Sequence, residues 1–139
     1  MTDLALTAAQ IALTKPQEAE VGFAVCAVAV TAGQSLFVDT AGKVDLADAN
    51  VSGAQQTRAL ALEAGAIGQS ISILYRGRVY GFTIAQAYDA PIYQSDTAGA
   101  LGDAAGTMTV PVGIIEAVSD DPTFTKVLFF NPRKREDYA

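Results

Sequence analysis

Hydrophobic and polar residues alternate along most of this chain with a period of two, which is the spacing of a β-strand. The alternation is clearest at residues 35–38, 69–75 and 124–130. No segment carries the 3.6-residue spacing of a long amphipathic helix. Roughly nine short segments of this kind, separated by Gly, Pro and Asp, predict an all-β fold. We expect either a compact β-barrel or a sandwich of short antiparallel strands.

The tetrapeptide Asp-Thr-Ala-Gly occurs twice, and each copy follows a strand-like segment. An Asp at the start of such a turn can accept hydrogen bonds from backbone amides ahead of it, and the Gly can adopt a positive φ without steric cost. The residues expected to form these turns are Asp39, Gly42, Asp96 and Gly99. The repetition predicts an internal two-fold repeat, with units at about residues 33–75 and 87–130.

Three other segments lead to specific expectations. The run at residues 20–30 is apolar at both odd and even positions, so it predicts a strand covered on both faces. Residues 58–64 predict another strand, although their Ala, Leu and Glu content also favours a helix. Arg76-Gly77 has the composition of a two-residue turn, so we expect a hairpin between residues 69–75 and 78–88.

The chain divides into three parts by composition. Residues 1–19 are rich in Ala, Thr and Gln with irregularly spaced apolar side chains, and they predict an extended N-terminal arm that docks on a surface. Residues 20–130 are long enough to form a single β domain with its own core. Residues 131–139 are polar and predict an exposed C-terminal tail, in which the basic cluster at 133–135 is offset by two acidic residues.

Charge and cysteine content narrow the class of protein. The 139 residues carry a net charge of −6, which argues against nucleic-acid binding because that needs clustered Lys and Arg. Only 17% of the residues are charged, so much of the surface is free to make contacts. No apolar run approaches the roughly 20 residues of a membrane-spanning helix. The single cysteine, Cys26, lies in an apolar run and predicts a buried hydrophobe in a protein made in a reducing cytoplasm.

The sequence offers little chemistry for catalysis. It has no histidine, and the motifs of nucleotide, calcium and zinc sites are missing. We therefore expect no catalytic, cofactor-binding or metal-binding residues. Two carboxylate pairs could in principle perform acid–base catalysis, Asp45 with Asp48 and Asp120 with Asp121, but both pairs lie in turn-like segments. A small β-barrel hydrolase that uses Asp45 and Asp48 is the enzyme alternative.

The order of several segments resembles a known family. Residues 33–49 read GQSLFVDTAGKVDLADA and residues 58–74 read RALALEAGAIGQSISIL. Later in the chain, residues 90–99 read APIYQSDTAG and residues 112–117 read VGIIEA. This order is similar to the small capsid cement, or head decoration, proteins of tailed bacteriophages. The resemblance covers about residues 33 to 130.

The resemblance implies a non-enzymatic structural protein of the virion. Such a protein binds the outer surface of an icosahedral phage capsid and stabilises the shell. The implied partners are the major capsid protein and further copies of the same chain, most often as a homotrimer and in some cases as a dimer, with no cofactor and no nucleic acid. The implied location is the outer surface of the virion, after synthesis in the host cytoplasm.

Candidate contact residues are large apolar side chains of the arm and aromatic side chains of the domain, which are favoured in interfaces. They are Leu4, Leu6, Ile11, Leu13, Phe23, Tyr88 and Tyr93. The alternative function is a phage fibre or carbohydrate-binding β module. In that module Tyr75, Tyr80 and Tyr93 would form the sugar platform.

Overall fold

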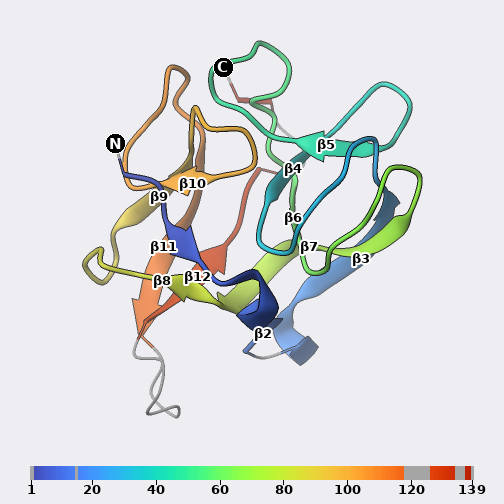
Figure 1. The fold of residues 1–139 in the computed structure, drawn as a ribbon. Helices are drawn as coiled ribbons and strands as arrows, with labels where there is room; N and C mark the ends of the chain where they lie inside the picture. Colours follow the sequence, from blue (N-terminus) through green and yellow to red (C-terminus); the bar gives the residue numbers. More distant parts are fainter. Residues whose placement is uncertain (1, 15, 118–125, 134–136, 139) are drawn as a thin grey trace.

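The computed structural model of the chain describes residues 2–14, 16–117, 126–133 and 137–138. The fold is nearly all β, and its main sheet is a curled antiparallel sheet that forms a half-barrel (Figure 1). The prediction of an all-β fold is confirmed. Within the described residues, the only helices are two short 3₁₀ helices, Ala8–Gln10 and Pro16–Glu18, and neither is long or apolar enough to cross a membrane.

Ten strands form the main sheet, and two more form a small ribbon beside it. The path through the main sheet is β10-β9-β11-β12-β7-β6-β4-β5, with β2 and β3 also paired to β7, and β1 pairs with β8 in the ribbon. The strands are β1 Ala5–Leu6, β2 Ala12–Leu13, β3 Glu20–Val25, β4 Ser35–Val38, β5 Val44–Leu46, β6 Ala59–Ala61, β7 Ser70–Tyr80, β8 Phe82–Thr83, β9 Pro91–Gln94, β10 Leu101–Gly102, β11 Pro111–Ala117 and β12 Lys126–Phe130. β6 confirms the strand predicted within residues 58–64.

The longest strand, β7, lies at the centre of the sheet. One of its edges pairs with β2 and β3, and the opposite edge pairs with β6 and β12. The hairpin predicted at Arg76-Gly77 is wrong, because the strand continues through both residues. Arg76 lies opposite Glu20, and Gly77 lies opposite Phe130. Strands from distant parts of the chain hold this segment extended, and no local signal in residues 76–77 reports that pairing.

Two hydrophobic clusters fill the curl of the sheet, and β7 contributes to both. Leu74 and Val79 belong to the first cluster, together with residues of β9, β10, β11 and β12. Ile71 and Ile73 belong to the second cluster, together with residues of β4, β5 and β6. Cys26 is also part of the second cluster and is fully buried, so the prediction of a buried hydrophobe is confirmed.

A buried polar network joins the two repeat units predicted from the sequence. The Gln94 side chain is fully buried, and its Nε2 donates hydrogen bonds to the backbone oxygens of Ala47 (2.8 Å) and Ala100 (2.9 Å). Its Oε1 accepts a bond of 3.0 Å from the Thr57 hydroxyl. Because a buried amide is costly unless its polar atoms are paired, this network fixes the position of β9 against the loops that follow β5.

The two Asp-Thr-Ala-Gly turns each join a pair of antiparallel strands, but their aspartates act differently. Asp39 accepts two hydrogen bonds of 2.9 Å from backbone amides of its own turn, as predicted. Asp96 instead accepts bonds from the backbone amide (2.8 Å) and hydroxyl (2.9 Å) of Thr107, so it ties its turn to a more distant loop. Gly42 and Gly99 both have a positive φ, of 81° and 77°, as predicted.

The N-terminal segment, residues 2–14, packs on the domain of its own chain. In Figure 1 it is the dark blue segment that carries β1 and β2. Leu4 belongs to the first cluster and its amide donates to the backbone oxygen of Leu101 at 2.7 Å. Ile11 packs on Gly81, where an added Cβ would lie 2.6 Å from the Ile11 Cδ1 atom. Gly81 also has a φ of 108°, so glycine is required there by both backbone conformation and space.

The described part of the C-terminal tail also docks on the domain. Tyr138 is buried in the first cluster, and its hydroxyl donates a 2.9 Å bond to the Pro111 oxygen. Its amide and carbonyl both bond the Gln56 side chain, at 2.7 and 2.9 Å. Asp137 forms an ion pair of 2.6 Å with Arg58. The expectation of an exposed tail is therefore wrong at Tyr138, because an aromatic ring in a polar tail fills the core.

Candidate interaction surfaces

Strand β3 exposes an apolar face. Val21, Phe23 and Val25 are 45%, 75% and 36% exposed, respectively. The residues between them, Gly22 and Ala24, are turned the other way, and Ala24 packs against the second cluster. The prediction that this strand is covered on both faces is wrong. Only its even-numbered side chains face the core, and the apolar odd-numbered set lies on the surface.

The outer edge of β3 is also exposed to pairing. The strand pairs with β7 along one edge. On the other edge, Val44 of β5 forms a parallel bridge with Cys26 just past the strand, and the Val44 oxygen accepts a 2.8 Å bond from the Ala27 amide. The Cys26 amide, just past the strand, donates to the Gln69 oxygen (2.9 Å) on the β7 side. Backbone groups alternate in direction along a strand, so the amides and carbonyls of Val21, Phe23 and Val25 point away from β7. The open edge and the apolar face therefore coincide at Val21 and Phe23, whereas β5 covers the edge from Val25 onward.

A second exposed surface lies at the start of β12. Tyr88 is 53% exposed, and the Lys126 Nζ atom lies 5.1 Å from the centre of its ring, within the range of a cation–π interaction. The same Nζ donates a 2.5 Å bond to the Gln86 oxygen, which fixes the cation beside the ring. β12, which carries Lys126, and β3 pair with opposite edges of β7, so the Tyr88–Lys126 contact and Phe23 lie on different parts of the sheet. Figure 1 shows β12 to the left of β3.

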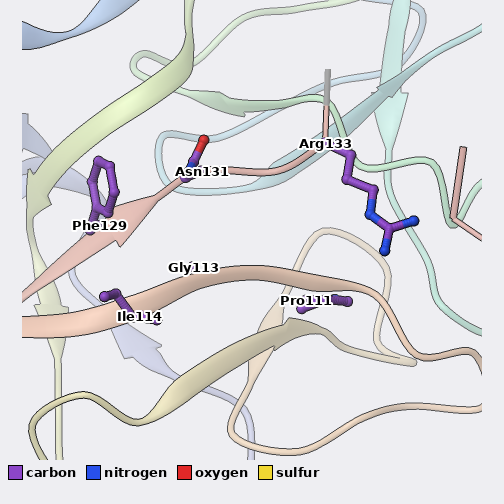
Figure 2. A pocket seen from close by; sticks show the side chains of 6 residues that line it. All are labelled: Pro111, Gly113, Ile114, Phe129, Asn131 and Arg133. Carbon is purple, nitrogen blue, oxygen red and sulfur yellow. The ribbon is translucent and has the colours of Figure 1, made fainter. Parts of the chain in front are cut away.

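A shallow hollow of about 320 Å³ lies on β11 and β12 and was not anticipated from the sequence. Figure 2 shows its lining residues, which come from the two neighbouring strands and the segment after β12. They are Pro111, Gly113, Ile114, Phe129, Asn131 and Arg133. The guanidinium groups of Arg76 and Arg78 lie over the Phe129 ring, at 5.4 and 4.9 Å from its centre. The sequence signal was the alternation in residues 124–130, which places Phe129 opposite the core-facing Leu128 and Phe130.

The structure divides the seven candidate contact residues into two groups. Leu4 is buried, and Leu6, Ile11 and Leu13 pack against the first cluster. Tyr93 is half-buried on β9. Among the seven, only Phe23 and Tyr88 are exposed, and they lie on the two separate surfaces described above. Contact of any of the seven with a partner stays a prediction.

The carboxylates considered for catalysis take part in local hydrogen bonds. Asp45 Oδ1 accepts a bond of 2.7 Å from the Leu46 amide, and Asp48 Oδ1 accepts one of 2.9 Å from the Asn50 amide. The Asp120–Asp121 pair lies outside the described residues. Within the described chain, no group of three or more Cys, Asp or Glu residues is placed to hold a metal ion.

Within the part of the chain that the structure describes, four ionisable groups have a shifted pKa. The pKa of Glu63 is lowered because its carboxylate accepts a 2.8 Å hydrogen bond from the Ser72 amide. The pKa of Asp103 is lowered chiefly because its carboxylate accepts a 2.8 Å bond from the Thr2 amide. Burial raises the pKa of the Cys26 thiol and of the Tyr138 phenol. Each shift is explained by burial or by a hydrogen bond to a backbone amide, so none of the four points to a catalytic group.

Of the three tyrosines of the carbohydrate alternative, Tyr75 and Tyr80 lie on β7 and Tyr93 lies on β9, which is not a neighbour of β7. Tyr75 packs against the second cluster, and its ring lies against Gly22. Tyr80 ends β7, whereas Tyr93 lies on β9, and β11 and β12 separate these two strands in the sheet. A flat platform shared by the three rings is therefore not what the fold presents.

Comparisons with known proteins provide no further identification. No protein-family model matches the chain. No curated protein and no solved structure matches it either. The similarity to phage cement proteins thus rests on the residues quoted from the sequence.

Proposed function

We propose that this chain is a structural virion protein that binds the outer surface of an icosahedral phage capsid and stabilises the shell. It does so as a homo-oligomer, a trimer by the family resemblance or a dimer. Its partners are the major capsid protein and further copies of itself, and no enzymatic activity is involved. The protein is made in the host cytoplasm and resides on the capsid.

The observation that carries this proposal is the exposed apolar face of β3. A folded domain with a complete core gains nothing in its own stability from Val21, Phe23 and Val25 on its surface. Contiguous exposed apolar side chains are typical of protein interaction sites. A protein whose work is to make contacts between subunits needs such a surface, and one whose work is catalysis does not.

A cement protein needs two surfaces, one for its own copies and one for the shell. We assign the Tyr88–Lys126 surface to the shell, because it lies apart from β3 and combines an exposed aromatic ring with a cation. Aromatic and basic side chains of this kind are favoured as energetic centres of interfaces. Symmetric attachment of several copies then adds weak contacts into a strong overall attachment.

The test is adsorption to expanded phage capsids that lack their decoration protein. The wild-type chain should bind at a fixed number of copies per shell and raise the temperature at which the shells break. Tyr88→Ala should weaken adsorption about tenfold or more, as expected for an interface centre. Val51→Ala is the matched control, because Val51 is 50% exposed in a loop and is assigned no contact.

Removal of residues 1–19 would be a poor test, because it would also remove core side chains such as Leu4. Wild-type protein that is folded but neither adsorbs to shells nor changes their thermal stability would refute the proposal. Equal adsorption by Tyr88→Ala and Val51→Ala would refute only the assignment of the shell-facing surface.

The carbohydrate-binding alternative has one observation in its favour, the hollow on β11 and β12. Phe129 offers a ring face there, and Asn131 and Arg133 offer polar groups beside it. Glycan-array binding that is lost in Phe129→Ala, together with no adsorption to shells, would favour this alternative over the cement protein.

A further inference from the structure

We propose that the hollow on β11 and β12 binds an extended acidic peptide segment of a partner protein. One apolar side chain of the segment sits in the hollow, and carboxylates on either side of it pair with arginines at the edges. The inference goes beyond the proposed function and does not depend on it, because binding of a defined peptide is measured without capsids.

The floor of the hollow is apolar and is kept open by a glycine. Ile114 and Phe129 lie directly opposite each other on β11 and β12, and Figure 2 shows Pro111 towards the other end of the lining. An added Cβ at Gly113 would meet the backbone oxygen of Phe129, so no larger residue fits there. The volume of about 320 Å³ is at the lower end of the range of ligand pockets. A shallow hollow of this size is suited to one apolar side chain of an extended segment.

Two arginines lie at the edges of this floor. Arg133 follows β12, and Figure 2 shows its side chain extending toward the strand that carries Pro111. Arg76 lies on β7, and its guanidinium lies over the Phe129 ring of β12. Glu20 is opposite Arg76 on β3, which pairs with the other edge of β7, so the guanidinium is turned away from Glu20. Neither arginine forms an ion pair with a carboxylate in the part of the chain that the structure describes.

A third arginine on the same face is already neutralised. Arg78 lies over the same aromatic ring as Arg76, at 4.9 Å from its centre. The Nε atom of Arg78 pairs with Glu116 at 2.6 Å, and its Nη1 atom pairs with Glu18 at 3.4 Å. An arginine on this face therefore binds carboxylates of its own chain, and the charges of Arg76 and Arg133 are left for a partner.

Arg133 is held in place by contacts within its own chain. Its guanidinium lies over the Tyr138 ring, 4.9 Å from the centre, and its Nη1 atom donates a 3.3 Å bond to the Asp137 oxygen. Its amide donates a 2.7 Å bond to the Tyr138 hydroxyl, which in turn bonds the Pro111 oxygen. An arginine fixed in this way loses less side-chain freedom when it binds a ligand. Because arginine and carboxylate form charge-assisted hydrogen bonds, the arrangement favours an acidic ligand over a neutral sugar.

The charge of the whole chain makes this surface distinctive. The net charge is −6, with 15 acidic against 9 basic residues, so an acidic partner is repelled by most of the molecule and attracted only where arginines gather. Recognition of acidic motifs by clustered arginines is a recurring mode of peptide binding. A peptide fits this hollow because it can place an apolar side chain between two carboxylates.

The first experiment measures peptide binding by fluorescence anisotropy. The probe is a dye-labelled, end-blocked peptide of sequence Glu-Glu-Leu-Glu-Glu, and the control peptide carries Gln in place of each Glu. Wild type should bind the acidic peptide saturably and about tenfold more tightly than the control peptide, as expected when charge-assisted hydrogen bonds are lost. Binding of the acidic peptide should weaken as the salt concentration is raised.

Variants of the two arginines test the assignment of the site. Arg76→Gln and Arg133→Gln should each weaken binding of the acidic peptide about tenfold. Arg133→Lys should lie between wild type and Arg133→Gln, because lysine keeps the charge but cannot form two parallel bonds to a carboxylate. Lys43→Gln is the matched control, since Lys43 is exposed between β4 and β5, away from β11 and β12. The thermal midpoint of each variant verifies that it is folded.

A second measurement locates the bound peptide by nuclear magnetic resonance. In isotope-labelled protein, the amide signals that shift on titration with the acidic peptide should be those of Gly113, Ile114 and Asn131. The amide signals of Val21 and Tyr88 should stay unchanged, because these residues lie on other surfaces.

Three results would overturn the inference. They are no saturable binding up to about 1 mM peptide, equal binding of the acidic and control peptides, and shifts confined to residues outside the hollow. Binding of a neutral glycan in the hollow, with no binding of the acidic peptide, would also overturn it and would favour the carbohydrate alternative. A chain that binds the peptide but not shells refutes the proposed function alone, whereas a chain that adsorbs to shells and binds no peptide refutes this inference alone.

Discussion

Two apolar segments follow one another along the same edge of β7, and they bury their side chains to opposite extents. The N-terminal segment buries Leu4 in the first cluster and packs Leu6, Ile11 and Leu13 against it. In contrast, β3 directs Phe23 and its apolar neighbours outward. Hydrophobicity is similar in the two segments. Both segments pair with β7, but the large side chains of the N-terminal segment pack on the first cluster, while β3 turns its large apolar side chains away from the core. Apolar content alone therefore does not separate core from contact surface.

Truncating a core residue of the N-terminal segment should have the largest effect. We expect Leu4→Ala to lower the free energy of unfolding by about 3 to 4 kcal/mol, because a buried Leu side chain leaves a cavity. Val21→Ala should change it by less than about 0.5 kcal/mol in the monomer. Urea denaturation at low protein concentration measures both. Equal losses would mean that the two segments do not differ as described.

The glycine beneath the N-terminal segment provides the next test. Gly81→Ala should cost about 2 to 3 kcal/mol, because the positive φ is strained for alanine and the new Cβ meets Ile11. Gly42→Ala is the matched control. Gly42 also has a positive φ but has no atom within 4 Å of an added Cβ, so the cost should be about 1 kcal/mol. The difference between the two, measured by thermal or urea unfolding, isolates the contact with Ile11.

Thiol labelling should distinguish the buried face of the β3 segment, marked by Cys26 just past the strand, from its exposed face, marked by Val21. Cys26 is buried and its thiol pKa is raised by burial, so the reactive thiolate is scarce below pH 8. We expect iodoacetamide to label Cys26 only on unfolding. Val21→Cys in a Cys26→Ala background should be labelled readily in the folded monomer, as followed by mass spectrometry. Rapid labelling of native Cys26 would contradict the alternation of the two faces.

The smallest expected effect concerns pH. The pKa of Asp103 is lowered in the folded chain, so its bond to the Thr2 amide contributes stability above the ordinary Asp pKa of about 3.9. That contribution should be lost as the pH falls through the lowered folded-state pKa. The stability gap between wild type and Asp103→Asn should therefore be small at pH 7 and close in acid. The stability gap between wild type and Glu63→Gln should also close in acid, because the pKa of Glu63, whose carboxylate bonds the Ser72 amide of β7, is lowered as well. A gap that widens in acid would show that the shift has the opposite sign.

Local patterns predicted those features that depend on neighbours in the sequence. The period of two predicted an all-β chain, and the Asp39 turn and Gly42 follow directly from side-chain and backbone preferences. Arg76-Gly77 misled for the opposite reason, because strands more than 45 residues away hold it extended. Tyr138 reached the core through Gln56 and Pro111, contacts that no local pattern of a polar tail reveals.

The candidate surface was predictable only in part. Phe23 and Tyr88 were singled out by residue type and proved exposed, but Val21 and Val25 were assigned to a covered strand. An apolar strand with both faces hydrophobic is typical of a buried strand, and the same pattern arises when one face is kept for a partner. The hollow beside Phe129 depends on the register in which β11 pairs with β12, which alternation alone does not encode.

The central position of β7 has a consequence for how the molecule comes apart. This one strand supplies side chains to both clusters and pairs with strands near both ends of the chain, so neither cluster can open while the other stays intact. Unfolding should then be a single cooperative event, and amide protons in the middle of β7 should exchange with solvent only when the whole domain unfolds. Refolding should be slow for a domain of this size, because nearly every partner of β7 must be recruited from far along the chain.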